Sequence, residues 1–140
     1  MEKDSFRRAV EARKIDDMVD AFTEDAVIHS PVSFKPIEGR AAIRTLLTIL
    51  LEVFQEFRYT DQLESNEGTR GLIFQARVGD RELEGLDLLR FNNSNQIYDL
   101  TVMVRPRSAI EALRLAVGSR LIRDKGISWK SWWKRIKGVR

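Results

Sequence analysis

Residues 81–105, RELEGLDLLRFNNSNQIYDLTVMVR, carry the clearest structural pattern of the chain. Apolar and polar residues alternate on both sides of the segment Asn92–Asn95, which is typical of two strands joined by a turn. Because strand side chains alternate between faces, Leu83, Asp87 and Leu89 share one side of the first strand. The pattern therefore directs one carboxyl group, that of Asp87, toward an apolar interior.

The segments before this hairpin extend the pattern into a sheet. Arg58–Glu64 and Arg70–Val78 also alternate with period two, and Gly79 and Asp80 are typical turn residues. Together with Gln96–Arg105, these segments predict an antiparallel meander of four or five strands. EDAVIHSP, residues 24–31, predicts a further short strand, and the following SFKPIEG predicts a loop.

Helical spacing of apolar residues surrounds the predicted strands. A first helix begins at Asp4 or Ser5, a second follows Ile15, a long one spans Arg40–Phe57, and another begins at Ser108. The long helix needs a broad apolar surface to cover. We therefore expect an α+β domain in which the helices cover one face of the sheet.

Length and composition narrow the class of protein. A chain of 140 residues with 43% hydrophobic and 32% charged residues is expected to form one globular domain. The absence of cysteine excludes disulfides, thiolate catalysis and zinc–thiolate sites. The sequence has neither a signal peptide pattern nor a run of about 20 apolar residues, and we expect a cytoplasmic protein.

Two interpretations of Asp87 stay open at this stage. A buried carboxyl group without a cation has a raised pKa, and its neutral form can donate a hydrogen bond to a carbonyl or enolate oxygen of a ligand. In the structural interpretation, Asp87 instead accepts hydrogen bonds from a neighbouring hydroxyl, an amide or the Arg13 side chain.

Three stretches resemble the nuclear transport factor 2-like superfamily, in particular its SnoaL-like and ketosteroid-isomerase-like branch. They are FTEDAV at 22–27, PIEGRAAI at 36–43 and DLLRFN at 87–92, and the likeness covers residues 5 to 117. The resemblance implies a cystatin-like cone, a curved antiparallel sheet wrapped around the long helix, with a cavity at its open end. It also implies a homodimer formed through the outer sheet face, which carries Leu86, Leu88, Thr101 and Met103.

The resemblance also assigns residues. In ketosteroid isomerases the base is an Asp before a Pro, which matches Ser30, and the oxyanion tyrosine matches Phe6. Their protonated Asp matches Asp87. Because the base and the tyrosine are both missing, we predict no ordinary steroid isomerase activity. Val102 stands where epoxide hydrolases of this fold carry a carboxylate, whereas His29 with Asp87 resembles the acid/base pair of SnoaL-like cyclases.

We therefore expect a cavity that binds an apolar, oxygen-bearing small molecule, with isomerase, cyclase or hydratase chemistry and neither metal nor cofactor. The alternative is a noncatalytic binding or dimerisation module whose cavity is filled by side chains. The expected acid/base residues are Asp87, His29 and Ser30. The expected ligand contacts are Phe6, Phe34, Phe54, Phe57, Tyr59, Phe74, Leu89, Leu100, Val102 and Val104.

Residues 118–140 form a predicted basic tail after a domain at 1–117, with eight Lys or Arg against the single Asp124. Its last part, SWKSWWKRIKGVR, has the pattern of an amphipathic helix with one Trp-rich side. Such a helix can lie on a membrane surface or stack on nucleic acid, but we expect no specific nucleic acid partner. The alternative is that Trp129, Trp132 and Trp133 pack on the domain or on a dimer partner.

Overall fold

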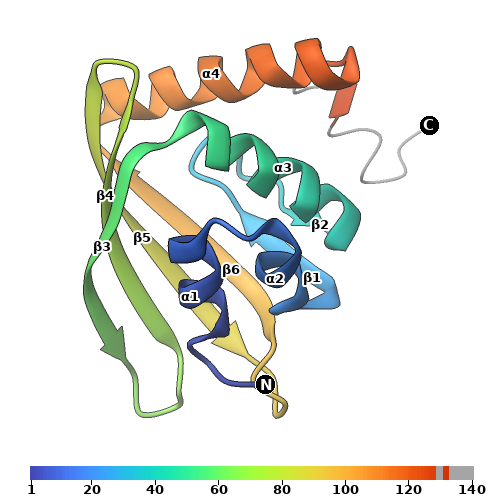
Figure 1. Cartoon of the computed structure of the whole chain (residues 1–140), viewed down its shortest axis with the longest axis vertical. Coiled ribbons are helices and arrows are strands. Elements are labelled where there is room, and N and C mark those ends of the chain that lie inside the picture. Colours follow the sequence, from blue (N-terminus) through green and yellow to red (C-terminus); the bar gives the residue numbers. More distant parts are fainter. Residues whose placement is uncertain (129–130, 133–140) are drawn as a thin grey trace.

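The computed structural model describes residues 1–128 and 131–132 and shows an α+β fold in which the helices lie on one side of a curved sheet (Figure 1). The fold class is therefore confirmed. The elements, in chain order, are α1 (Ser5–Ala12), α2 (Ile15–Asp20), β1 (Phe22–His29), β2 (Ile37–Glu38), α3 (Arg40–Val53), β3 (Gln55–Glu64), β4 (Arg70–Val78), β5 (Arg81–Phe91), β6 (Ile97–Arg105) and α4 (Arg107–Lys125).

The sheet has six strands in the order β2-β1-β6-β5-β4-β3. The predicted meander is present, because β3, β4, β5 and β6 pair with their chain neighbours in antiparallel register. Two strands lie beyond it. β1 joins β6 in parallel, and β2, which falls in the predicted loop, pairs with β1 through Ile37 opposite Ile28.

The long helix ends earlier than its apolar spacing predicts. Val53 is the last residue of α3, and Phe54 has extended backbone angles (φ −75°, ψ 129°). Glu56 has a positive φ of 54°, where the chain turns into β3. Phe54 and Phe57 continue the helical spacing because both contact the same apolar interior, although Phe57 belongs to the strand.

Two smaller differences also have a local cause. Period-two alternation predicts that Tyr98 shares the buried face of Leu100, but the pairing of β5 with β6 shifts between Arg90 and Phe91, so Ile97 is buried and Tyr98 is 46% exposed. Residue 98 is an extra residue in the ladder, and such a bulge turns a side chain outward. The last helix begins after Pro106 rather than at Ser108. Proline is well suited to the start of a helix because it has no backbone N–H group, and an N–H group at this place has no partner within the helix.

The core lies between α3 and the concave side of the sheet. Ile43, Leu46 and Leu47 of α3 are buried there, and Leu89 of β5 and Leu100 of β6 are buried on the facing strands. Burying one such side chain stabilises the fold by about 1.5–3 kcal/mol. Helix α3 and strands β5 and β6 are therefore held together by the interior that also contains Asp87.

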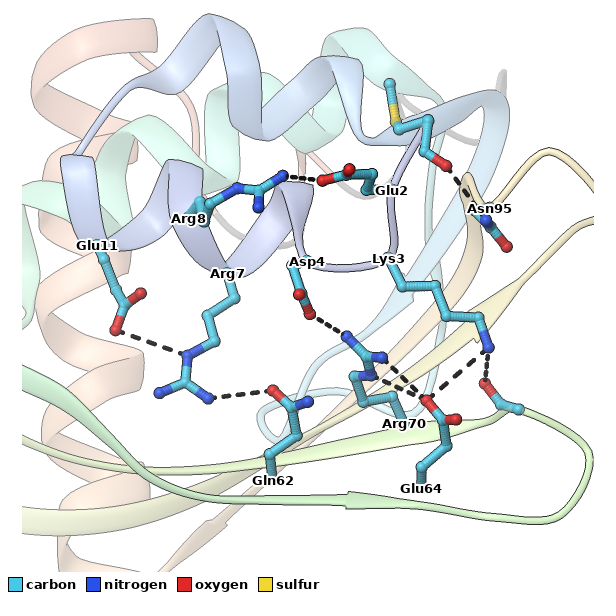
Figure 2. Close-up of polar contacts among 12 residues, drawn as sticks. Glu2, Lys3, Asp4, Arg7, Arg8, Glu11, Gln62, Glu64, Arg70 and Asn95 are labelled. Atoms are coloured by element: carbon cyan, nitrogen blue, oxygen red, sulfur yellow. Dashed lines mark hydrogen bonds and ion pairs between the residues drawn. The ribbon is translucent and has the colours of Figure 1, made fainter.

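Charged groups hold the N-terminal segment to the turn end of the β3–β4 hairpin (Figure 2). The Asp4 carboxylate pairs with Arg70, whose guanidinium also contacts Glu64 at 3.0 Å. Lys3 Nζ donates to the carbonyl oxygen of Gly68 at 3.1 Å. These contacts hold α1, which carries Phe6, across the concave side of the sheet.

The predicted tail at 118–140 is described at residues 118–128 and 131–132. α4 is one continuous helix from Arg107 to Lys125, and it runs through the expected boundary at residues 117 and 118. Trp132 is buried against the core at 5% exposure. No helix among residues 1–128 and 131–132 is long and apolar enough to cross a membrane. The predicted amphipathic pattern otherwise rests on residues outside those ranges, namely Trp129, Lys130 and residues 133–140.

Candidate ligand site

A cavity of about 380 Å³ lies between the helices and the concave face of the sheet. Its volume is within the range of small-molecule sites, about 300–1,000 Å³. Every helix contributes to its wall: Phe6 from α1, Met18 from α2, Leu50 from α3 and Leu113 with Val117 from α4. The wall is mainly apolar, which favours ligands that lose little hydration when they enter.

Asp87 lies in this apolar wall. It comes from the middle of β5, opposite Leu72 on β4 and Val102 on β6, and its side of the strand is the buried one. Asp87 is 7% exposed and is the one buried charged or polar residue among the described residues. A carboxyl group in such a place must keep a partner, stay protonated or serve a ligand.

Burial raises the pKa of Asp87 from 3.8 to about 7. The Tyr59 hydroxyl opposes this rise because it favours the charged carboxylate, and no cation of the described residues contributes. The structural interpretation with Arg13 is therefore wrong, since Arg13 Nη2 instead donates to the carbonyl oxygen of Leu51 at 2.7 Å. Near neutral pH, Asp87 can thus donate or accept a proton.

Tyr59 presents the second polar group of the inner cavity. Its hydroxyl is buried and forms no hydrogen bond of regular geometry with any described residue. The Tyr59 hydroxyl nevertheless lies near the Asp87 carboxyl. Burial first, and then the charge of Asp87, raise the pKa of Tyr59 well above 10.0. Without a regular bond between them, both groups can turn toward a ligand oxygen.

Aromatic rings surround this polar pair. Phe57 stacks on Phe74 with ring centres 4.8 Å apart and an interplanar angle of 26°. The Phe57 and Tyr59 rings meet edge to face at 5.0 Å, and Phe54 lies 5.9 Å from Phe74. Packed rings have few alternative positions, so they fix the orientation of the Tyr59 ring.

The cavity brings together most of the predicted site residues. Ser30 lies on its wall, and Ser30 Oγ accepts hydrogen bonds from the backbone nitrogens of Val32 and Ser33, both at 3.3 Å. Its hydroxyl proton is left to donate, so Ser30 can contact a ligand without acting as a base. The other predicted residues on the wall are Phe6, Phe54, Phe57, Tyr59, Phe74, Asp87, Leu100 and Val102.

Four predicted residues lie elsewhere. His29 is the last residue of β1 and points away from the side of its buried neighbour Ile28, and its Nε2 lies 3.0 Å from Oδ2 of Asp99, so it does not form the expected pair with Asp87. Phe34 is fully exposed, and Val104 joins it and His29 along a separate shallow groove. Leu89 is buried in the core at 0% exposure. Strand alternation explains His29, because consecutive residues point to opposite faces.

The sequence interpretation missed two parts of the site. Tyr59 was expected only as an apolar contact, and its partnership with Asp87 depends on how β3, β4 and β5 pair, which periodicity does not reveal. The apolar contribution of Leu113 and Val117 from α4 was also missed. Their spacing of four on a helix shows a buried stripe but does not say what that stripe covers.

Comparison with known proteins gives a family for this architecture. The family model of the SnoaL-like domain matches residues 4–99. The chain belongs to the SnoaL-like family. The predicted resemblance to the nuclear transport factor 2-like superfamily, and to its SnoaL-like branch, is therefore confirmed. No curated protein matches the chain.

Solved structures support the SnoaL-like assignment. A steroid delta-isomerase from Pseudomonas aeruginosa is 36% identical, with a TM-score of 0.83 over 87% of this chain and 90% of that chain. A Silicibacter pomeroyi protein with a cystatin-like fold is 28% identical, with a TM-score of 0.81 over 86% and 85% of the two chains. SalBIII, an epoxide hydrolase/cyclase-like enzyme, shares the fold at 21% identity and a TM-score of 0.62, over 76% of this chain and 88% of SalBIII.

The ionisable side chains of the described residues limit the chemistry that is possible in the cavity. Within residues 1–128 and 131–132, no three His, Cys, Asp or Glu side chains are arranged to hold a metal ion. The ionisable residues that line the cavity are the buried Asp87, Tyr59 with its buried hydroxyl, and the exposed Glu11, Arg13, Glu56 and Arg58. Any proton transfer deep in the cavity therefore depends on Asp87, Tyr59 or the ligand itself.

Proposed function

We propose that this SnoaL-like protein binds an apolar molecule through a carbonyl oxygen and moves a proton at that oxygen, as an isomerase or cyclase does. The observation that carries the proposal is the buried Asp87, which lies beside the Tyr59 hydroxyl on the wall of a cavity of about 380 Å³. Two neighbouring proton donors can hold a carbonyl or enolate oxygen, and a carboxyl group with a pKa of about 7 is suited to proton transfer at neutral pH.

The open cavity favours this proposal over the noncatalytic alternative. A module whose interior is filled by side chains has no room beside Asp87, whereas here Phe74, Leu100 and Asp87 border the same space. The proposed chemistry does not follow the usual route of steroid isomerases. Ser30 and Phe6 stand on the cavity wall where that route needs a carboxylate and a tyrosine, and neither side chain can replace them.

Binding of a simple ketone tests the proposal. We expect 2-acetylnaphthalene to bind about tenfold more tightly than 2-ethylnaphthalene at about pH 5.5, because protonated Asp87 donates to the carbonyl oxygen. At about pH 8.5 the preference should fall, because the carboxylate repels the carbonyl oxygen. Titration calorimetry at the two pH values measures both affinities.

Two variants sharpen the result. Asp87→Asn keeps an N–H donor at every pH, so the preference for the ketone should persist and lose its pH dependence. Asp87→Leu removes this donor and leaves the Tyr59 hydroxyl alone, so the preference for the ketone should shrink and lose its pH dependence. Equal and pH-independent binding of both compounds by the unaltered protein would refute the proposal.

We also propose that two copies of the protein associate through the outer face of the sheet. On that face Met103 is 54% exposed, and Leu86 and Leu88 of β5 are half-buried beside it. We expect sedimentation analysis to give a dimer, and Met103→Glu to shift it toward monomer at micromolar concentration, because a charge in an apolar contact loses hydration. Arg81→Glu, at the exposed β4–β5 turn, is the control; a monomer before any substitution rules out this contact.

A further inference from the structure

The Tyr59 ring has a cation beside it as well as aromatic neighbours. The guanidinium carbon of Arg7 lies over the ring, 5.1 Å from its centre. The rings of Phe57 and Phe74 meet the Tyr59 ring edge to face, with ring centres 5.0 and 6.5 Å away. Arg7 does not line the cavity, so it contacts Tyr59 without taking up the space that is open to a ligand.

Arg7 is itself held at two points, one on each element that it joins. It belongs to α1, and its Nε lies 3.6 Å from Oε2 of Glu11, one turn later on the same helix. Its Nη1 donates to Oε1 of Gln62 at 3.1 Å, and Gln62 belongs to β3, as Tyr59 does (Figure 2). A guanidinium is planar and donates in fixed directions, so these two contacts limit where its plane can lie. A guanidinium that is fixed in this way can also fix the ring that it covers.

The charge of Arg7 also acts on the Tyr59 hydroxyl. Burial first, and then the charges of Asp87 and Glu11, raise the pKa of this hydroxyl. The charge of Arg7 lowers the same pKa, because a nearby cation favours the phenolate. The Arg7 side chain is 31% exposed and that of its neighbour Arg8 is 60% exposed, so solvent screens the charge of Arg7 less. Arg7 therefore strengthens the Tyr59 hydroxyl as a hydrogen-bond donor.

We propose that Arg7 is a positioning residue of the cavity, which holds the Tyr59 ring so that its hydroxyl faces a ligand oxygen beside Asp87. The inference rests on the proposed function for the ligand oxygen, but the hold on the ring is tested without any ligand. In the structural alternative, Arg7 only joins α1 to β3, as Asp4 joins the start of α1 to Arg70. Loss of Arg7 then lowers stability and has no selective effect on the Tyr59 ring or on a ligand oxygen.

The first measurement follows the Tyr59 ring in the free protein. The chain has two tyrosines, so a protein made with isotope-labelled tyrosine gives two sets of ring signals in nuclear magnetic resonance spectra. Tyr98→Phe removes one set and thereby identifies that of Tyr59. We expect the Tyr59 ring to flip about fivefold faster in Arg7→Met, because methionine has neither the charge nor the planar group that covers the ring. Relaxation of the ring carbons measures the rate.

The second measurement follows the ligand oxygen. At about pH 5.5, where Asp87 is largely protonated, Arg7→Met should reduce the preference for 2-acetylnaphthalene over 2-ethylnaphthalene about threefold. Affinity for 2-ethylnaphthalene should stay unchanged, because this probe has no oxygen for Tyr59 to bind. Arg7→Lys keeps the charge but loses the planar group, so its preference should lie between those of Arg7→Met and the unaltered protein. Titration calorimetry measures the affinities.

Two control proteins locate the effect. Arg8→Met removes the neighbouring charge on α1, which pairs with Glu2 at 2.6 Å, and it should change neither the Tyr59 ring nor the affinities. Tyr59→Phe has no hydroxyl to position, so adding Arg7→Met to it should leave the remaining ketone preference unchanged. Circular dichroism spectra that match those of the unaltered protein show that the variants fold.

The outcomes separate the two proposals. A Tyr59 ring that flips at the same rate in Arg7→Met overturns the positioning role of Arg7. A faster ring with an unchanged ketone preference overturns it as well, as does an equal loss of preference in the Tyr59→Phe background. If the unaltered protein does not prefer the ketone, the proposed function fails, and the ring rates alone then decide whether Arg7 holds Tyr59.

Discussion

Raising the pH from about 5 to about 8 is expected to cost the folded protein about 3 kcal/mol of stability through Asp87 alone. Burial raises the pKa of this group from 3.8 to about 7, so the folded state binds its proton more tightly than the unfolded chain does. The stabilising contribution is complete below the unfolded pKa and disappears as the pH rises through the folded pKa. Urea denaturation at a series of pH values measures the change.

The comparison with Asp87→Asn isolates this contribution. Asparagine has nearly the same shape and does not titrate, so the variant keeps the pH dependence of every other group. The free energy of unfolding of the variant should therefore change by about 3 kcal/mol less than that of the unaltered protein over this pH range. Parallel curves for the two proteins would show that Asp87 is charged or well solvated in the folded state.

The inward position of Asp87 could be predicted because it follows from local geometry alone. Period-two alternation in residues 81–91 places Leu83, Asp87 and Leu89 on one face, and the structure buries all three. The antiparallel meander follows from the same alternation with turn residues between the strands. Neither inference needs to know which distant segments meet.

The contacts around Asp87 depend on distant segments and could not be predicted in the same way. Tyr59 comes from β3, two strands away from β5, and its pairing with Phe74 of β4 sets the face on which its ring lies. The helical spacing of Phe54 and Phe57 was equally misleading, because a helix and a strand that face one interior can continue a single apolar pattern. Pattern alone does not show where one element ends.

His29 shows the limit of reasoning from resemblance. An acid/base pair with Asp87 requires both side chains on the concave face, but His29 follows the buried Ile28 on β1 and faces Asp99 on the other side. The resemblance gave the correct family and the correct cone, because those depend on the whole order of elements. A single side chain depends on its own register, which must be established from its own strand.

Replacing Gly85 by alanine is expected to destabilise the protein by about 2–3 kcal/mol, at the upper end of the cost of overpacking. Gly85 lies on the buried face of β5, directly opposite Phe74 of β4. A Cβ atom at Gly85 would lie 2.1 Å from Cζ of the Phe74 ring, far inside van der Waals contact. The ring cannot move away freely, because it is stacked on Phe57 at 4.8 Å.

A second substitution tests whether the ring is the cause. Phe74→Leu removes the ring atoms nearest to residue 85, so Gly85→Ala should cost at least about 1 kcal/mol less in that background. The same displacement should push the Phe74 ring into the cavity, since Phe74 lines it, and weaken binding of naphthalene probes by Gly85→Ala. Urea denaturation of the four proteins of this cycle measures the cost of Gly85→Ala in both backgrounds. Equal costs would show that space for the Phe74 ring is not what requires glycine at position 85.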